Sequence, residues 1–373
     1  YGASGPEGAD RFYLGAASAA AASGDSAKQV LYVLACLAIV VVHVSIRKYD
    51  VKNIPISIPY NIACFWCLLS FLWAIEPGIS FRRTLGMYTV LIAMSGCVLH
   101  LGAKETLRTV YLFLSLLIPL SLLSITLSSM DLFSFAVHPA SEGDPAVAGA
   151  WKGILFHKNV AGAIMVHSTI FFLHYVVNRG NKLDWALLLM SIVFLIGTKS
   201  KTSVGLVMFA VSLGYLYKYL YTNRMGLLFN LFLLSSLMVI LLFAYLFSDD
   251  IYRFWENPDS LTGRTQIWRS LTPYIAEHFW LGSGYGSFWS IGDRSPIINL
   301  ALTDFISGIG HSHSGYFEII LTTGAIGFVF AISALIILPL YRFLHPNPLD
   351  IPLYSMLLSI WTFGVCQNFT ESQ

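Results

Sequence analysis

The chain has 373 residues, of which 56% are hydrophobic and only 11% are charged. A soluble globular domain carries charge on about a quarter of its residues, so this composition indicates a protein that crosses a membrane several times. The formal net charge of +2 and the lack of a long block of Lys and Arg give no reason to expect a nucleic-acid partner.

Residues 1–29 are rich in Gly, Ala and Ser, and we expect no defined fold for them. The rest of the chain contains apolar runs long enough to cross a bilayer as helices. We expect spans at 30–46, 56–75, 85–103, 108–127, 159–178, 183–198, 201–221, 225–247, 314–341 and 351–369. The predicted fold is therefore an all-α polytopic membrane protein, with transmembrane helices in 30–247 and again in 313–373.

Two connections between these spans are much longer than the others, residues 128–158 and residues 248–312. Loops of more than about 15 residues within a compact bundle are usually functional or disordered. Trp and Gly are frequent in 248–312, which favours an ordered loop with short helices.

The Lys and Arg residues are divided evenly between the two faces that this topology predicts, so their number does not fix the orientation. On one face they lie in short connections, whereas on the other they coincide with the two long loops. Long loops cross the membrane largely regardless of charge, so we place both of them outside the cytoplasm. The cations beside them then need a partner, and an anionic substrate is the simplest one.

The segment GTKSKTS at 197–203 predicts a tight turn between two spans, with Lys199 and Lys201 and no acidic neighbour. Two cations in such a turn can clamp a diphosphate, or they can anchor the protein at the membrane interface. Arg82 and Arg83 allow the same two interpretations.

The segment LTGRTQIW at 261–268 begins like a helix after an N-cap at Ser260 or Thr262. We expect this helix on the membrane surface, with an apolar face made of Ile267, Leu271, Tyr274 and Ile275. Arg264 lies in the first turn, where free backbone N–H groups also favour an anion. Arg264 therefore either binds an anionic substrate or reaches toward lipid headgroups.

Residues 282–288, with the sequence GSGYGSF, form a Gly-rich turn that could approach a phosphate or a sugar closely. The segment lacks the strand and the Lys of a P-loop, so the alternative is a simple turn. The sequence leaves both interpretations open.

His311 and His313 stand at the start of the apolar run 314–341. Imidazole is the side chain best suited to moving a proton near neutral pH, and a membrane rim lets it face water beside a lipid-linked substrate. A metal site would need further ligands, and the loop offers only Asp293 and Asp304 nearby. We therefore expect no metal ion or other cofactor. The alternative role for His313 is structural, as a capping or hydrogen-bonded residue at the interface.

Several segments, taken in order along the chain, resemble one family of membrane enzymes. They are SFLWAIEPGISFRR at 70–83, KGILFHKNVAG at 152–162, GTKSKTS at 197–203, TGRTQIW at 262–268, GSGYGSFW at 282–289, HSHSGYFEIILTTGAIG at 311–327 and NFTES at 368–372. In this order they resemble the O-antigen ligase and Wzy-type polysaccharide polymerase superfamily.

The resemblance implies a GT-C-like bundle of about 10–12 transmembrane helices in the bacterial inner membrane, with the active site facing the periplasm. Such enzymes transfer a glycan en bloc from undecaprenyl diphosphate to an acceptor hydroxyl, with inversion and without a metal. The forms of GTKSKTS and GSGYGSFW are closer to members that polymerise exopolysaccharides than to lipopolysaccharide ligases. We therefore expect a polymerase of lipid-linked repeat units of an exopolysaccharide or O-antigen. The alternative is an O-antigen ligase that acts on lipid A-core.

Residue by residue, His313 matches the essential histidine of the family and Arg264 its loop arginine. Lys201 falls where many ligases have a second arginine, and Lys keeps the charge but loses the bidentate fork of Arg. We expect His313 to act as a general base and Arg264, Lys201 and Lys199 to bind the diphosphate. The expected supporting residues are His311, Tyr316, Glu318, Arg82, Lys158 and Asn159.

A transporter or flippase of lipid-linked glycans is the competing class. Ion-coupled carriers usually place Asp or Glu within spans, and the first eight predicted spans have no acidic residue in their interiors. A flippase that holds a diphosphate would still need the cations, so this class stays open. For the enzyme, the expected partners are an undecaprenyl-diphosphate-linked oligosaccharide, a glycan or lipid-linked glycan acceptor, and membrane lipids.

Overall fold

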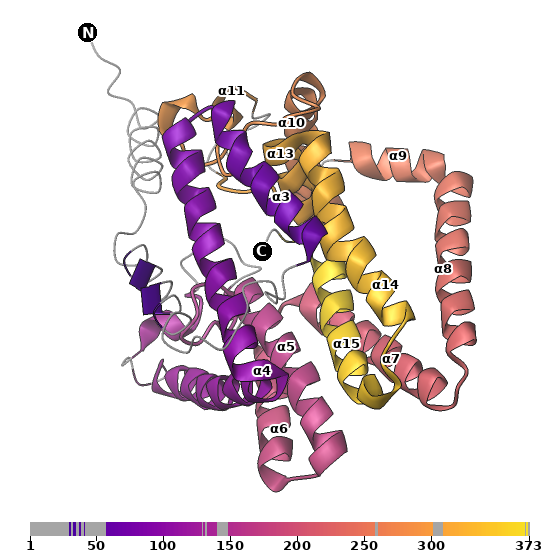
Figure 1. Cartoon of the computed structure of the whole chain (residues 1–373). Coiled ribbons are helices and arrows are strands. Elements are labelled where there is room, and N and C mark those ends of the chain that lie inside the picture. The colour runs from indigo at the N-terminus through magenta and orange to yellow at the C-terminus, as the bar shows by residue number, and fades with distance from the viewer. Residues whose placement is uncertain are drawn as a thin grey trace. The chain divides into compact units, whose positions relative to one another are not determined.

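The computed structural model describes residues 57–128, 130, 133–139, 148–257, 260–300, 309–369 and 371, together with Val30, Val33, Leu34, Leu37, Ala38 and Val41. The described residues are mainly helical and contain no strand, although an isolated antiparallel bridge joins Val137 and Trp151 (Figure 1). Residues 1–29, most of the span predicted at 30–46, and Asp304 lie outside them.

The chain divides into two compact units, each built from two separate parts of the sequence. The first unit comprises residues 1–106 and 244–340, and the second comprises residues 107–243 and 341–371. The chain crosses these boundaries within the helices α4 (Pro77–Ser128), α8 (Gly226–Leu246) and α14 (Leu338–Leu344).

The first unit contains the start of α4 and a set of shorter elements. These are α3 (Ile58–Leu69), η2 (Ser70–Leu72), α9 (Ser248–Glu256), η4 (Ser260–Gly263), α10 (Arg264–Glu277), η5 (Gly292–Arg294), α11 (Ile297–Leu300), α13 (Gly315–Ile332) and the π-helical turn η6 (Ser333–Ile337). Helix α3 packs beside α13, and α10 contacts both α11 and α13 (Figure 1). An aromatic-rich core holds them together, made of Ile267, Trp268, Leu271, Tyr274, Phe288, Trp289, Ile297 and Leu321.

The second unit contains the end of α4, most of α8 and a bundle of apolar helices. The further elements are η3 (Ser134–Ala136), α5 (Lys158–Arg179), α6 (Lys182–Gly197), α7 (Lys201–Thr222), η7 (Pro348–Asp350) and α15 (Ile351–Gln367). Helix α5 packs against α6, and α7 packs against α15. The short connection between α5 and α6 has local causes, since Gly180 ends α5 with a φ of 66° and the Asn181 side chain caps α6 by accepting the Leu183 N–H.

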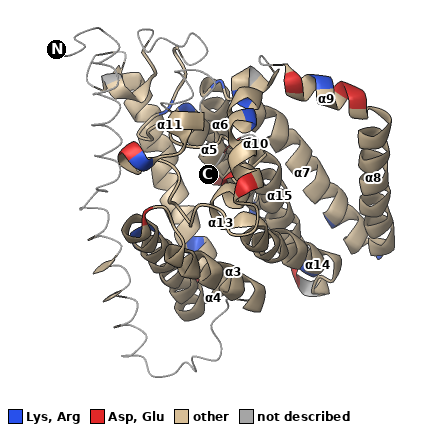
Figure 2. Cartoon of the chain, turned by 90° about the horizontal axis from the view of Figure 1, so that it is seen from above, with Lys and Arg blue, Asp and Glu red and all other residues tan. Residues whose placement is uncertain are grey.

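The prediction of an all-α polytopic membrane protein is confirmed. Within the described residues, five helical segments are long and apolar enough to cross a membrane: Pro77–Ser128, Lys158–Arg179, Lys201–Thr222, Gly226–Leu246 and Gly315–Leu344. The shorter apolar helices Ile58–Leu72 and Ile351–Gln367 fall on two further predicted spans. Figure 2 shows charged residues gathered on α9, whereas α8 is drawn almost entirely in tan.

The spans predicted at 85–103 and 108–127 lie on α4, which consists of two helices that meet at a kink without an intervening loop. The backbone still leaves helical geometry within it, at Gly102, where φ is 73° and ψ is 168°. Only glycine adopts such dihedral angles readily, so this residue marks where the direction of the chain can change.

Candidate active site

The two histidines lie in a tight turn that precedes α13 in the first unit. Their ring centroids are 4.0 Å apart, and the backbone N–H of His313 donates to Nδ1 of His311 over 3.3 Å. His311 is exposed and His313 is half-buried. The φ of His313 is 54°, in the left-handed region. A non-glycine residue held there costs on the order of 1–3 kcal/mol, and such residues cluster at functional sites.

Ser312, between the two histidines, fixes this turn from both sides. It is fully buried. Its backbone N–H donates to Oε2 of Glu318 over 3.3 Å, and its carbonyl accepts the indole N–H of Trp268 over 2.9 Å. Its hydroxyl donates to the carbonyl of Ser314, the residue that precedes α13, over 2.7 Å. The position of His313 is therefore set by the turn that precedes the helix.

Glu318 in the first turn of α13 joins the histidine turn to the Gly-rich turn. The oxygen that accepts from Ser312 also accepts the indole N–H of Trp289 over 2.9 Å. Hydrogen bonds to a charged acceptor are the strong ones in proteins, about 1.5–3 kcal/mol each. This carboxylate thus orients a backbone, and the sequence had suggested it only as a supporting residue.

Three aromatic rings stack behind the histidine turn. The Trp268 and Phe317 rings are nearly parallel, with centroids 5.1 Å apart and an interplanar angle of 6°. Trp255 of α9 stacks with both, at 5.9 Å from Trp268 and 6.0 Å from Phe317. The stack joins α9, α10 and α13 into one support for the turn.

Arg264 lies in the first turn of α10, as the sequence predicted, but the predicted N-cap at Ser260 or Thr262 is wrong. The cap is Gly263, with a φ of 83°, and Ser260–Gly263 form a short 3-10 turn ahead of it. Ile267, Leu271 and Tyr274 are buried as expected, and Ile275 packs against the same core. Arg264 is half-buried at the helix N-terminus, where backbone N–H groups and the helix dipole favour an anion. Tyr316 in the first turn of α13 is also half-buried.

The Gly-rich turn packs against other parts of the chain and does not form an open loop that could bind a phosphate. A Cβ on Gly284 would lie 2.3 Å from the Cβ of Ala74, so glycine is required for this approach. The Ser283 N–H donates over 3.0 Å to the carbonyl of Leu321, just before α13 leaves helical geometry at Gly324. These contacts favour the simple structural turn over the phosphate-binding interpretation.

The Arg83 side chain binds the Gly-rich turn and the two residues that follow it. Its guanidinium donates to the carbonyls of Gly286, Trp289 (3.0 Å) and Ser290 (3.3 Å). Neither interpretation of Arg83 from the sequence, diphosphate binding or lipid anchoring, describes this structural role. Arg82, the neighbouring candidate, is half-buried on α4.

Lys199 lies in the turn between α6 and α7 of the second unit, and Lys201 is the first residue of α7. Lys199 has a left-handed φ of 53°, and its Nζ donates to the carbonyl of Ala148 over 3.0 Å. Lys201 is exposed at the first position of α7 and has no ion-pair partner in the described part of the chain. Lys201 is therefore the more available of the two cations.

Lys158 and Asn159 begin α5 in a polar cluster that includes residues missed from the sequence. The His157 ring caps the helix by accepting the Asn159 N–H, and the Lys158 N–H donates to Nε2 of His138 over 3.2 Å. The Asn159 amide donates to the buried carboxylate of Glu371 over 2.9 Å. His157 and Glu371 lie within the quoted segments KGILFHKNVAG and NFTES, which was the available signal.

The candidates thus belong to two sets. Arg82, Arg264, His311, His313, Tyr316 and Glu318 lie in the first unit, and Lys158, Asn159, Lys199 and Lys201 lie in the second. Together, the apolar helices and the braced histidine turn define a polytopic membrane protein with a candidate active site next to a predicted span.

Comparison with known proteins gives one family match. Residues 185–332 match the family model described as O-Antigen ligase, which supports the resemblance to the O-antigen ligase and Wzy-type superfamily. The matched region contains Lys199, Lys201, Arg264, both histidines of the turn, Tyr316 and Glu318. No curated protein matches the chain. This match supports a multi-pass membrane glycosyltransferase of the ligase or polymerase type that acts on lipid-linked glycans.

Proposed function

We propose that the chain transfers a glycan en bloc from undecaprenyl diphosphate to an acceptor sugar hydroxyl at the periplasmic face. Its most favoured reaction is polymerisation of lipid-linked repeat units of an exopolysaccharide or O-antigen. The observation that carries this proposal is the left-handed His313, braced through Ser312 by Glu318 and Trp268, within the residues that match the family. A turn held in this way suits a side chain that must keep one position during a reaction.

A glycosyl diphosphate already contains a good leaving group. The protein therefore has two tasks, to remove the proton of the acceptor hydroxyl and to stabilise the negative charge of the departing diphosphate. His313 takes the proton of the acceptor hydroxyl while that oxygen bonds to the anomeric carbon on the face opposite the diphosphate. The bond between the anomeric carbon and the diphosphate oxygen breaks, and its electron pair leaves with undecaprenyl diphosphate. The configuration at the anomeric carbon is inverted, and no metal is needed in this scheme.

Arg264 and Lys201 are the proposed partners of the departing diphosphate. Arg264 can donate two parallel hydrogen bonds from its fork, and α10 adds the positive end of its dipole. Lys201 supplies a point charge at the start of α7. Lys199 is the weaker candidate because its ammonium already donates to the Ala148 carbonyl. His311, Tyr316, Arg82, Lys158 and Asn159 remain proposed supporting residues.

A ligase is the second candidate, and the description of the matching family model favours it. The experiment that separates the candidates uses purified full-length protein in liposomes with a lipid-linked repeat unit. A ladder of products that differ by one repeat supports polymerisation. A single transfer that occurs only when lipid A-core is supplied supports the ligase, and translocation without a new glycosidic bond would overturn the enzyme proposal in favour of a flippase.

A further inference from the structure

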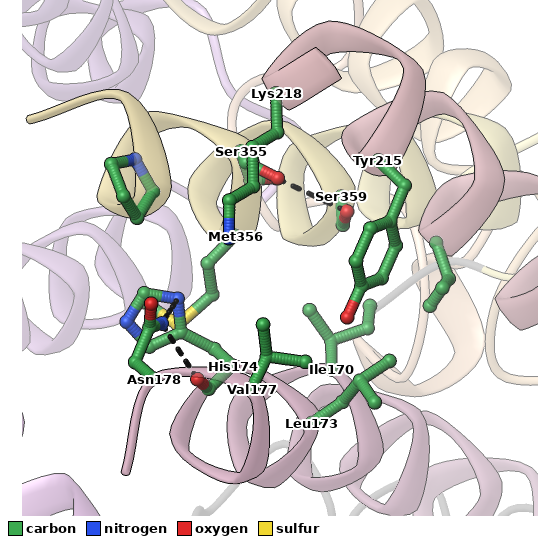
Figure 3. A pocket seen from close by; sticks show the side chains of 12 residues that line it. Ile170, Leu173, His174, Val177, Asn178, Tyr215, Lys218, Ser355, Met356 and Ser359 are labelled. Atoms are coloured by element: carbon green, nitrogen blue, oxygen red, sulfur yellow. Dashed lines mark hydrogen bonds between the residues drawn. The ribbon is translucent and has the colours of Figure 1, made fainter. Parts of the chain in front are cut away.

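A cavity in the second unit has no part in the proposed transfer. It lies between α5, α7 and α15 and is partly open to the outside. Its lining combines apolar side chains with a small polar group (Figure 3).

The cavity forms beside a close approach of two helices. The Ser355 hydroxyl of α15 donates to the Gly214 carbonyl of α7 over 2.7 Å, and a Cβ on Gly214 would lie 2.0 Å from the hydroxyl of Ser359. Small residues permit such contact between membrane helices. Tyr215 and Lys218, which follow on α7, face into the space that remains between the three helices (Figure 3).

One side of the cavity is apolar, where Ile170, Leu173 and Val177 of α5 lie together, and the His174 and Asn178 side chains line a polar end (Figure 3). At the polar end, Asn178 donates to the carbonyl of His174 over 2.7 Å. Figure 3 shows the Lys218 side chain entering from α7 with its amine on the side of Met356 and His174.

Lys218 is the unexplained feature of this lining. It is half-buried, and it has no carboxylate partner within the described residues. A cation beside apolar side chains is costly unless an anion compensates it. An anionic group from outside the chain would compensate the charge of Lys218.

The position of Lys218 along α7 indicates where that anion comes from. Lys218 lies 17 residues after Lys201 on the same helix. At 1.5 Å per residue this is about 26 Å, close to the thickness of the hydrocarbon core of a bilayer, roughly 30 Å. With α7 across the bilayer, the two cations would stand near opposite membrane surfaces, and the polar end of the cavity would lie at the level of the lipid headgroups.

We propose that this cavity binds an anionic phospholipid from the leaflet opposite to Lys201. The headgroup phosphate contacts the Lys218 ammonium near His174 and Asn178, and part of one acyl chain lies along Ile170, Leu173 and Val177. The combination of a cation with an apolar wall selects an amphiphile with a negative headgroup. Such a lipid would bridge α5, α7 and α15 and stabilise the second unit. The inference does not depend on the proposed glycan transfer.

The test measures lipid binding to the purified full-length protein by thermal unfolding and native mass spectrometry. The probes are dioleoylphosphatidylglycerol, dioleoylphosphatidylcholine and sodium phosphate. Phosphatidylglycerol should raise the melting temperature and stay bound, whereas the other two should have little effect. Lys218→Ala should weaken phosphatidylglycerol binding roughly fivefold, the effect of one basic residue at a membrane surface.

Two more variants distinguish lipid binding in this cavity from a general electrostatic attraction of anionic lipid to the protein. Val177→Trp places a large ring at the exposed rim of the apolar wall and should also weaken phosphatidylglycerol binding, without a change in charge. Lys182→Ala removes an exposed cation of the same unit outside the cavity and should leave binding unchanged. Equal effects of the two lipids, a full effect of phosphate alone, or wild-type lipid binding by Lys218→Ala and Val177→Trp would each overturn the proposal.

Discussion

The carboxylate of Glu318 accepts the indole N–H of Trp289 over 2.9 Å, and the same oxygen accepts the backbone N–H of Ser312. One side chain of α13 therefore fixes both the Gly-rich turn and the turn that carries His313. Since a charged acceptor holds these donors more strongly than a neutral one, the charge of Glu318 is expected to matter for the position of the imidazole.

We expect Glu318→Gln to lower the rate of glycan transfer roughly 10- to 150-fold, corresponding to a loss of about 1.5–3 kcal/mol from the two hydrogen bonds to the charged oxygen. The amide oxygen can still accept from Trp289 and Ser312, but it carries no charge, so both bonds are weaker. Turnover and donor binding should be measured separately, because a positioning role predicts that turnover falls while the donor Kd changes little. A variant with wild-type turnover would show that the carboxylate does not orient the base.

Trp268→Phe removes the hydrogen bond to the Ser312 carbonyl and keeps a ring in the aromatic stack. A net neutral hydrogen bond contributes about 0.5–1.5 kcal/mol, so we expect a moderate loss of turnover, about 2- to 15-fold. Trp255→Phe is the matched control, since it changes the same stack without affecting the bond to Ser312. Equal losses in the two variants would assign the effect to stacking and not to the position of the turn.

The sequence predicted the helices well and the bracing of the site poorly. Each predicted span within the described residues falls on a helix, because long apolar runs are a local signal. The contacts that hold the histidine turn and the Gly-rich turn are not local. Trp268 precedes Ser312 by 44 residues, and Arg83 contacts the Gly286 carbonyl across 203 residues. A single sequence carries no periodicity that pairs such residues, and for the same reason the bond from Asn159 to Glu371 was missed.

The sequence also did not predict the local backbone geometry of the site. The sequence offered Ser260 and Thr262 as caps of α10, and the chain uses the left-handed Gly263 instead. Lys199 and His313 adopt left-handed conformations, which are uncommon outside glycine, so the residue types alone did not predict them. Such positions are imposed by tertiary contacts rather than by propensity.

The cations of the donor site can be tested one at a time. Arg264→Ala and Lys201→Ala should each weaken donor use by about 1.5–3 kcal/mol, measured as kcat/KM for the lipid-linked oligosaccharide. Lys201→Arg should keep most of the activity because it keeps the charge. Lys199→Gly suits the positive φ and should cost less than Lys201→Ala. Normal donor use in Arg264→Ala and Lys201→Ala would return both residues to lipid anchoring.

Chelation tests the metal-free scheme. The described residues contain no group of three or more His, Cys, Asp and Glu that could hold a metal ion. Activity of the purified protein should persist in excess EDTA, measured by the amount of glycan product formed. A loss of activity that one divalent ion restores, and that other ions do not, would contradict the scheme.

The most direct test of the proposed function is glycan transfer by His313→Ala, with His311→Ala as the matched control. Both variants remove an imidazole from the same turn, where the two rings are 4.0 Å apart, so a general disturbance should affect them alike. We predict that His313→Ala abolishes product formation in a single-turnover assay while expression and donor binding stay intact, and that His311→Ala costs much less. Normal turnover by His313→Ala, or equal losses in the two variants, would contradict the assignment of His313 as the general base.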